Sequence, residues 1–557
     1  MDNKRLILLL AFGFSLVMLW DAWQKQNLPK PPLPSATSST PTASSTPVPQ
    51  QISPGATSAV APGMGQTAGL AAGQAPGAAS TTKALVKTDL FVAEVASQGG
   101  DLVRLELIRH KATEDGSKNF VLLENSTEHL YLAQSGLMGE GLPNHKTEYK
   151  LAPGTYELKP GVDALELRLE APETNGVKVT KLYRFHRDSY LIDVAYEVTN
   201  NRTTPLVGNV YYQLIRDGKI PPRGITSVST FTGPAVYTEE GKFQKIEFAD
   251  IEKAKAKFVS KAANGWIAMV QHYFVAGWAP QGKEDREFYA QKIGDNLFST
   301  GVIVPIPSVA PGQTAQVSVP LYAGPQEQAR LEKVAPGFER VVDYGWLTII
   351  AAPIYWALEL IHRLVGNWGW AIILLTISIK AVFFPLSAAS YRSMAKMRLV
   401  TPKLVKIKEQ FADDRNRMNQ EMMELYKREK INPLGGCLPI LVQIPVFISL
   451  YWVLLGSVEM RHAPWMLWIQ DLSAKDPYYV LPLIMGVTML VQTRLNPTPP
   501  DPIQAKVMMA MPIVFTAMFL FFPSGLVLYW IVNNLLSIGQ QWQITRMVEG
   551  GKPKAKR

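Results

Sequence analysis

Several residue patterns that support common chemistry are missing from this 557-residue sequence. Its only cysteine is Cys437, so no disulfide can form within the chain, and its seven histidines show no HExxH or His-x-His spacing. None of its Gly-Lys pairs is followed by Ser or Thr, so it also lacks a phosphate-binding loop of the Walker type. These absences argue against disulfide exchange, zinc-dependent hydrolysis and a Walker-type motor, and they predict neither a metal site nor a cofactor.

Charged residues are also scarce. They make up 18% of the sequence, against about 25% in an average soluble domain, which argues against a wholly soluble protein. The 56 Lys and Arg residues outnumber the 46 Asp and Glu residues, and the resulting net charge of +10 suits an anionic partner such as lipid or RNA. Net charge alone does not separate these two partners.

Residues 1–28 form the first predicted unit. Two basic residues precede a charge-free apolar run, Leu6–Trp20, which is either a cleaved signal peptide or a retained anchor. The run leads into Trp20 and Trp23 and has no small-x-small cleavage site. Because tryptophan favours the membrane interface, we predict a retained transmembrane anchor with its basic end in the cytoplasm.

The next two predicted units are a disordered linker over residues 29–83 and a β-domain over residues 84–325. In the linker, 43 of the first 54 residues are Pro, Ser, Thr, Ala or Gly. Such a segment has too few large apolar side chains to offset the entropy lost on ordering, so it is predicted to be disordered. In the β-domain, short runs such as Leu191–Val198 alternate with the period of two that is typical of half-buried strands, which predicts a large β-sandwich. A structural or docking role is the simplest interpretation. A glycosidase-like carboxylate pair stays conceivable, although nothing in the sequence brings two carboxylates together.

A charged connector and an interfacial helix are predicted over residues 326–366, because the apolar run Trp346–Leu358 is short and ends in charges. Residues 367–545 then contain long windows without Asp or Glu. These windows are Trp368–Leu386, Ile431–Val458, Pro477–Thr493 and Val507–Thr545. The last window is too long for one crossing, and Pro523-Ser524-Gly525 supplies a turn near its middle, so the four windows fit five spans.

Together with the anchor, these spans predict six transmembrane helices, and an even number returns the chain to the side on which it started. The distribution of basic residues agrees with this topology. Residues 392–430 hold 11 Lys and Arg, and the tail 546–557 holds 5, whereas the predicted outward loop 456–476 holds 2. We therefore expect both termini in the cytoplasm and residues 29–343 on the outer side.

Lys380 is the one charged residue within these windows. A lysine near the centre of a membrane helix costs roughly 2.5–3.5 kcal/mol, so it needs a partner, water or an escape route. If the helix continues to Arg392, the ammonium lies about 18 Å from the cytoplasmic end, and its stem could snorkel toward that interface.

Other polar residues favour a shared polar groove around Lys380. Thr376 lies four residues earlier on the same helical face. The next spans are interrupted by Gln443, Trp530, Asn533 and Asn534. A lone Gln or Asn also often joins two membrane helices, so both interpretations remain open for these residues.

The cytoplasmic segment 392–431 is predicted to form a helical hairpin around Ala412-Asp413-Asp414. Leu404 and Ile407 lie on one face of its first half, and Met418 and Met422 form a matching stripe on its second half. The hairpin is either a solvated connector with a narrow core or a docking surface for a partner. The basic tail could contact anionic lipid or RNA, which is a weak indication of ribosome contact.

Several motifs occur here in an order that resembles a known family. They are Gly366-Asn367-Trp368-Gly369, Ser393-Met394-Ala395-Lys396-Met397, Asn432-Pro433-Leu434-Gly435-Gly436-Cys437, Asp476-Pro477-Tyr478-Tyr479, and the run from Phe522 to Tyr529. The sequence resembles the YidC membrane protein insertases of Gram-negative bacteria, which are related to the Oxa and Alb insertases of organelles. The motifs cover the whole C-terminal half, and the order of anchor, tether and β-domain is also similar.

The resemblance implies a polytopic α-helical membrane protein of the bacterial inner membrane, with six transmembrane helices, five of which form the insertase core. It also implies a large periplasmic β-supersandwich without known catalysis. Insertases of this family hold the polar segment of an arriving protein in a groove within the inner leaflet while its apolar segment enters the lipid, without nucleotide hydrolysis. The implied partners are nascent membrane proteins, the Sec translocon and the lipid bilayer, with no specific DNA.

The resemblance also assigns residues to the groove and to the hairpin. Thr376 and Gln443 match groove residues of the family, and Tyr529 belongs to the last motif. Lys380 stands where the family usually has Arg, and Trp530 stands where relatives often have a second Tyr. Both are departures, because Lys lacks the guanidinium fork and Trp lacks the hydroxyl. Met394 and Met397 belong to the motif that opens the hairpin.

Two other classes of protein stay open. A secondary transporter would also place a charge within a span, but it would usually show internal repeats and acidic coupling residues. An envelope enzyme would need a catalytic constellation in the β-domain.

Overall fold

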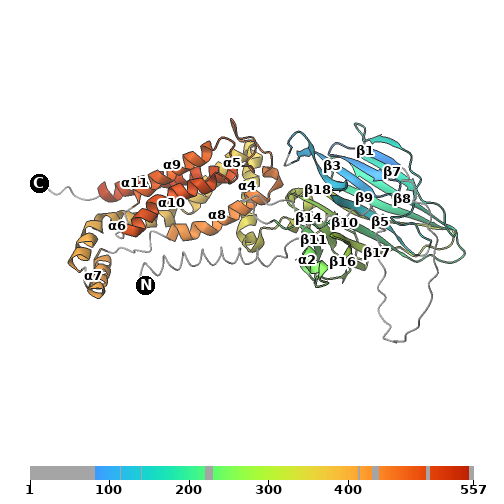
Figure 1. Cartoon of the computed structure of the whole chain (residues 1–557), viewed down its shortest axis with the longest axis horizontal. Coiled ribbons are helices and arrows are strands. Elements are labelled where there is room, and N and C mark those ends of the chain that lie inside the picture. Colours follow the sequence, from blue (N-terminus) through green and yellow to red (C-terminus); the bar gives the residue numbers. More distant parts are fainter. Residues whose placement is uncertain are drawn as a thin grey trace, which may run out of the picture. The chain divides into compact units, whose positions relative to one another are not determined.

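The computed structural model describes residues 82–112, 115–139, 141–219, 230–411, 414–429, 438–496 and 502–550. The predicted anchor, nearly all of the predicted linker, Cys437 and the end of the basic tail lie outside these residues. Strands make up the first part of the described chain, as far as Pro325, and helices make up most of the rest (Figure 1).

The described β-region contains two large sheets. The strand order of the ten-stranded sheet is β13 (Lys261–Ala262), β16 (Arg286–Gly294), β17 (Leu297–Pro305), β10 (Asn209–Asp217), β5 (Leu130–Met138), β4 (Asn119–Asn125), β3 (Leu102–Lys111), β2 (Phe91–Ala96), β1 (Lys83–Lys87) and β6 (Gly154–Glu157). The order of the eight-stranded sheet is β12 (Lys242–Lys245), β11 (Gly233–Thr238), β14 (Trp266–Gln271), β15 (Phe274–Trp278), β18 (Thr314–Pro325), β9 (Leu191–Asn200), β8 (Val177–His186) and β7 (Ala164–Glu170). The pairing of β1 with β6 is parallel, and β9 pairs antiparallel with both β8 and β18. A short helix, α2 (Phe248–Glu252), packs on β16.

Alternating side chains explain why the two sheets pack together. Val194, Tyr196 and Val198 of β9 are buried, whereas Asp193, Glu197 and Thr199 are partly exposed; Ala195 is a small residue that is buried as well. The Tyr196 ring lies 6.2 Å from the ring of Tyr212 on β10 of the other sheet. The strand predicted over Leu191–Val198 is present as β9. The two packed sheets confirm the predicted β-sandwich.

Helices α5, α8, α9, α10 and α11 largely coincide with the predicted apolar windows, whereas α3, α4, α7 and most of α6 lie outside them. Their bounds are α3 (Gln328–Leu331), α4 (Thr348–Val365), α5 (Trp368–Val382), α6 (Phe384–Gln410), α7 (Arg415–Arg428), α8 (Leu438–Gly456), α9 (Val480–Leu495), α10 (Pro502–Phe519) and α11 (Ser524–Gly550). Three short 3-10 helices are η1 (Phe338–Val341), η2 (Gly345–Leu347) and η3 (Val458–Met460). The helix ends on either side of Pro523 confirm the predicted turn in the last window. α11 packs against α5, α6 and α9. α4 packs against α5 and α8, and α10 packs against α9.

The predicted interfacial helix is longer than its apolar run. α4 has 18 residues and includes the charged residues that follow the run. It buries Ala351, Tyr355 and Leu358 against the neighbouring helices and exposes Ile349 and Leu364, whose exposed fractions are 86% and 80%. Of the described helices, α4 alone is by itself long and apolar enough to cross a membrane; α5 and α6 give a second such span if they are counted as one broken helix.

The first core window is not one straight helix, so the condition of an unbroken helix from Lys380 to Arg392 is not met. α5 ends at Val382, and α6 continues at an angle of 68°. Pro385 lies in the first turn of α6. Because proline lacks a backbone N–H and restricts the residue before it, the chain bends there while the sequence stays apolar.

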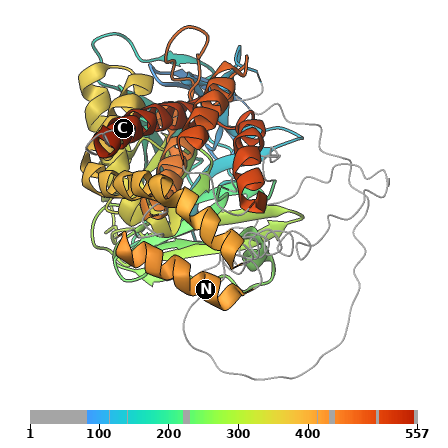
Figure 2. The same cartoon turned by 90° about the vertical axis from the view of Figure 1, so that its left-hand side faces the viewer.

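α6 and α7 form the predicted hairpin, and Figure 2 shows them side by side. Its core contains Val400, Leu404 and Leu425, with Met397 and Met422 packed against it. Met418 is half-buried outside this cluster. Met394 belongs elsewhere, because it packs with Tyr391 of α6 and Ile544 of α11. The N-terminal part of α6 is therefore held by α11, and only its C-terminal part pairs with α7.

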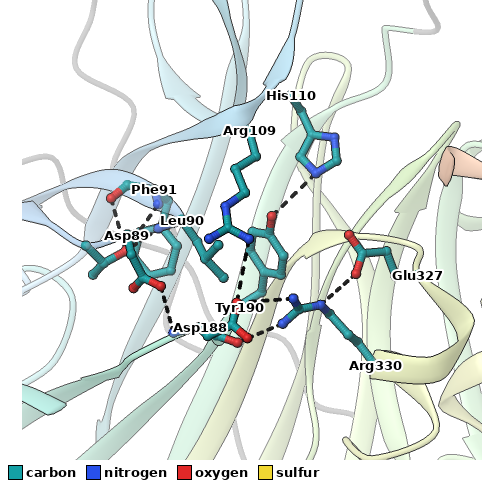
Figure 3. A network of polar contacts seen from close by, with 10 residues as sticks. Asp89, Leu90, Phe91, Arg109, His110, Asp188, Tyr190, Glu327 and Arg330 are labelled. Atoms are coloured by element: carbon teal, nitrogen blue, oxygen red, sulfur yellow. Dashed lines mark hydrogen bonds and ion pairs between the residues drawn. The ribbon is translucent and has the colours of Figure 1, made fainter. Parts of the chain in front are cut away.

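The connector after the β-sandwich is fastened to the strands by a network of ion pairs (Figure 3). Arg330 of α3 donates to the Asp188 carbonyl oxygen at 2.7 Å and to the Glu327 carboxylate at 2.6 Å. The Asp188 carboxylate also lies 3.7 Å from the Arg109 guanidinium at the end of β3. The β8–β9 turn, β3 and α3 are thus held together.

Arg461, which follows η3 between α8 and α9, inserts into an aromatic socket on the β-sandwich. Its guanidinium carbon lies 5.7, 5.8 and 5.5 Å from the ring centroids of Phe120, Tyr273 and Phe274. Its Nη2 donates to the Lys111 carbonyl oxygen. Guanidinium groups stack favourably on such rings, so Arg461 joins the β-sandwich to the loop that connects α8 and α9.

His110 lies beside this socket. Its Nε2 is 3.4 Å from the Tyr190 hydroxyl, and its ring meets that of Phe274 edge-on. Burial is the main cause that lowers the pKa of His110 to about 4, and the charge of Arg461 acts in the same direction. The imidazole is therefore neutral near pH 7 and adds no positive charge to this arginine-rich joint.

Candidate functional site

Lys380 lies in the last turn of α5, next to the bend. Its side chain is buried, with an exposed fraction of 7%, and its Nζ donates to the Ser537 hydroxyl of α11 at 2.8 Å. Its place near the C-terminal end of α5 is favourable for a cation, because the last carbonyl groups of a helix carry partial negative charge. The ammonium is thus held inside the helix bundle, away from the α5 surface.

A chain of hydrogen bonds continues from Ser537 across three helices. The Ser537 hydroxyl donates to the Asn533 carbonyl oxygen at 2.7 Å. On α8, the Gln443 amide donates to the Asn533 side-chain oxygen and lies 3.3 Å from the Tyr529 hydroxyl. The residues Lys380, Ser537, Asn533, Gln443 and Tyr529, from α5, α8 and α11, are called the lysine network below.

A small cavity opens beside the lysine network. Its lining residues are Ile379, Lys380, Phe383, Leu386, Ser387, Val442, Gln443 and Val446. Its volume of about 20 Å³ is enough for roughly one water molecule. Lys380 and Gln443, which are far apart in sequence, therefore share one small cavity between apolar side chains. A polypeptide segment does not fit this cavity unless the helices move apart.

The other predicted groove residues lie apart from the lysine network. The Thr376 hydroxyl donates to the Ile372 carbonyl oxygen of its own helix at 2.7 Å. Asn534 points to α9, where it donates to the Thr488 hydroxyl at 3.1 Å, which is the helix-joining role that the sequence left open. Trp530 packs between Phe447 and Phe519, with ring centroids 5.0 and 5.8 Å away.

Sequence reasoning did not identify Ser537 or Ser387. Ser537 lies one turn after Asn533 and so shares its face of α11, which is the only signal available in the sequence. A serine within an apolar window is usually a minor helix residue, so this signal is weak. Ser387 lies just after the bend, and its place in the cavity depends on that bend.

Residues of two motifs join the start of α5 to the loop between α8 and α9 and order that loop. Asn367 caps α5 by accepting from the Trp370 N–H, and its amide donates to the Pro464 carbonyl oxygen at 3.1 Å. Gly369 lies against Trp465, since an added Cβ would come within 2.2 Å of the Trp465 ring. The motif around Asn367 thus fixes the start of α5 to the loop between α8 and α9.

Asp476 orders the same loop from within. Its carboxylate is buried and accepts from the Trp468 indole at 3.0 Å, the Tyr478 N–H at 3.0 Å and the Leu481 N–H at 2.7 Å. These bonds set the start of α9. Through these loop contacts, the start of α5, the loop that follows α8 and the start of α9 are held together.

Among the described residues, no group of three or more His, Cys, Asp and Glu side chains could hold a metal ion. What the bundle does hold is a buried lysine, linked through hydroxyl and amide groups and surrounded by apolar helices. A β-sandwich joined to apolar helices with a polar interior is the architecture of a membrane protein with a large domain outside the bilayer.

Comparison with known families agrees with this class. Residues 83–357 match the family described as YidC periplasmic domain, and residues 360–552 match the family described as 60Kd inner membrane protein. The membrane protein insertase YidC of Aromatoleum aromaticum is 62% identical over 558 residues and covers 100% of both chains. The YidC insertase of Dechloromonas aromatica is 57% identical and covers 99% of this chain and 98% of its own. The chain belongs to the YidC family of membrane protein insertases.

Among solved structures, the chain is similar to that of an active YidC insertase with the first transmembrane domain resolved. It is 18% identical to this chain, covers 82% of it and 94% of its own chain, and superposes with a TM-score of 0.38. The family assignment rests on the full-length sequence relatives.

Proposed function

We propose that this protein inserts integral membrane proteins into the inner membrane, and that it also helps them to fold and assemble as a chaperone. The observation that carries this proposal is the 62% identity, over the whole chain, to a membrane protein insertase. The lysine network supports it, because a buried cation with hydrogen-bonding neighbours offers a place for a polar segment inside an apolar bundle.

The proposed membrane arrangement has six transmembrane helices. The first is the anchor in residues 1–28, and the other five belong to the core of residues 367–545, where the chain bends between α5 and α6. α4 lies in the outer interface, where its exposed Ile349 and Leu364 meet lipid. Residues 29–343 are periplasmic, and both termini, the tail 546–557 and the hairpin 392–431 are cytoplasmic.

The proposed mechanism uses the groove around Lys380 and needs no nucleotide. Hydration of the bundle interior lowers the barrier for the polar segment of the substrate, and transfer of about 20 apolar residues into lipid makes the product favourable. A positive charge in a poorly screened site attracts an acidic segment by Coulomb interaction. Lys380, Gln443, Tyr529 and Asn533 line this path, whereas Thr376, Trp530 and Asn534 hold the helices that form it.

The proposed partners follow from this task. They are nascent membrane proteins, the lipid bilayer and, for part of the substrates, the Sec translocon, while the protein also acts alone. The basic hairpin and tail favour a weak contact with the ribosome. The β-sandwich has a structural or docking role and no catalytic one, and specific DNA binding is not part of the function.

The proposal is tested with purified protein in liposomes. A small single-span membrane protein is added without ATP or GTP, and insertion is scored by protection from protease. We expect protection that depends on the purified protein and exceeds that of empty liposomes. Equal protection in empty liposomes, or an absolute requirement for nucleotide, would contradict the proposed function.

A further inference from the structure

The lysine network suggests a role for a residue that sequence reasoning did not identify. We propose that Ser537 is a positioning residue that fixes the Lys380 ammonium in the groove and thereby sets the preference of the protein for acidic substrate segments. This inference rests on the proposed insertase function and adds to it the residue that controls substrate charge. Ser537 is not itself expected to contact the substrate.

The geometry gives Ser537 a defined orientation. Its exposed fraction is 2%, and its hydroxyl hydrogen is used in the bond to the Asn533 carbonyl oxygen. A hydroxyl has one hydrogen and two lone pairs, so toward Lys380 it can only accept. The bond of 2.8 Å from the ammonium is therefore a charge-assisted bond to an oxygen that its own helix holds in place.

The ammonium keeps its other hydrogens for a ligand. An ammonium has three donors, and Ser537 uses one of them. The cavity lining contains Ser387 and Gln443 as further polar residues and no carboxylate, and none of the described Asp or Glu side chains forms an ion pair with Lys380. Ser537 thus orders the cation without neutralising it, which a carboxylate in the same place would do.

The same bond limits where the charge can go. A lysine side chain has four rotatable methylene links and could otherwise snorkel toward the cytoplasmic interface. Ser537 lies on α11, where its hydroxyl donates to the Asn533 backbone carbonyl oxygen, and the side-chain oxygen of the same Asn533 accepts from Gln443 on α8. The charge is therefore held between three helices, at the wall that an entering segment would meet.

The test compares two substrates that differ only in the charge of their translocated tail, one acidic and one neutral. Both are inserted into liposomes by the wild type and by Ser537→Ala, Ser537→Cys and Ser537→Thr. We expect the ratio of acidic to neutral insertion to fall about three- to tenfold in Ser537→Ala and Ser537→Cys, because the ordered bond to the charge is lost. Ser537→Thr keeps the hydroxyl and is expected to keep the wild-type ratio.

Ser449→Ala is the matched control. Ser449 is a buried serine of α8 whose hydroxyl has no hydrogen-bond partner among the described residues, so its removal leaves the lysine network intact. We expect it to keep the wild-type ratio. Ser537→Cys keeps the shape of the side chain, with a slightly larger atom at its end, and keeps the test valid if Ser537→Ala does not fold.

The outcomes separate the inference from the proposed function. If Lys380→Ala lowers the ratio but Ser537→Ala and Ser537→Cys leave it unchanged, the positioning role is wrong and the insertase stands. The same conclusion follows if the two Ser537 variants lower the insertion of both substrates equally. If Lys380→Ala leaves the ratio unchanged, the charge of the groove does not select substrates, and the role of Ser537 is refuted with it. If the wild type inserts neither substrate, the proposed function itself fails.

Discussion

Gly369 shows how much of the bundle geometry depends on single residues. It lies in the first turn of α5, where the absence of a side chain lets the Trp465 ring approach the backbone. Asn367, two residues earlier, both caps α5 and donates to the loop that carries Trp465. The two residues explain the motif physically, since one supplies hydrogen bonds and the other supplies space.

Gly369→Ala is therefore expected to destabilise the protein by about 1–3 kcal/mol through overpacking, because the added Cβ would lie 2.2 Å from the Trp465 ring. Gly539→Ala is the matched control, since Gly539 is also helical and an added Cβ meets nothing within 4 Å there. Alanine is the better helix former, so this control should be neutral or slightly stabilising. Thermal unfolding in detergent measures both. Equal melting temperatures for the two variants would refute the close packing at Gly369.

The residues of the candidate site were only partly predictable. Lys380 and Gln443 stand out because a charge and an amide are costly inside apolar windows. Asn533 and Asn534 are equally conspicuous in sequence, yet they face different helices, and only the packing of α11 decides which one joins the lysine network. Ser537 is inconspicuous because serine is common in apolar helices, and its importance comes from the partner that lies opposite.

At the scale of elements, local residue patterns predicted individual strands and breaks, but they did not predict which distant segments pair. The alternation in Leu191–Val198 predicts β9, and Pro523-Ser524-Gly525 predicts the break before α11. The order of the strands depends on pairings between distant segments, such as β10 with β5, which no local pattern encodes. The bend before α6 was missed because Pro385 stands within an uninterrupted apolar run.

The Arg461 socket gives a prediction at this scale. Arg461→Ala should free the loop after η3 from the β-sandwich, because the stacking on three rings and the bond to the Lys111 carbonyl oxygen are both lost. We expect hydrogen exchange in residues 458–476 and in the β14–β15 turn to become about fivefold faster or more. Arg461→Lys should give an intermediate result, because lysine keeps the charge and loses the planar group.

Arg363→Ala controls for the loss of a positive charge. Arg363 pairs with Glu359 within α4 and is largely exposed, so its removal should leave exchange in the loop and the turn unchanged. Unchanged exchange in Arg461→Ala as well would mean that the socket does not hold the loop.

At the scale of the whole molecule, the chain combines a β-sandwich, a connector fastened by Arg330 and a helix bundle with a polar interior. Two relatives are 62% and 57% identical to this chain over nearly their full length, which assigns the family. The sequence also pointed to this family through motifs whose roles the structure explains, such as the cap at Asn367 and the loop order set by Asp476. The central claim is that the bundle interior carries a positive charge that serves insertion.

Insertion measured with Lys380→Arg, Lys380→Ala and Lys380→Glu tests this claim most directly. Each purified variant is placed in liposomes without nucleotide, and protease protection of a single-span protein with an acidic tail is compared with that of the wild type. We predict that Arg preserves protection, that Ala lowers it about tenfold and that Glu lowers it further, because the Coulomb interaction with the tail changes from attraction to repulsion. Protection that is the same in all four proteins would contradict the claim and leave Lys380 as a snorkelling residue.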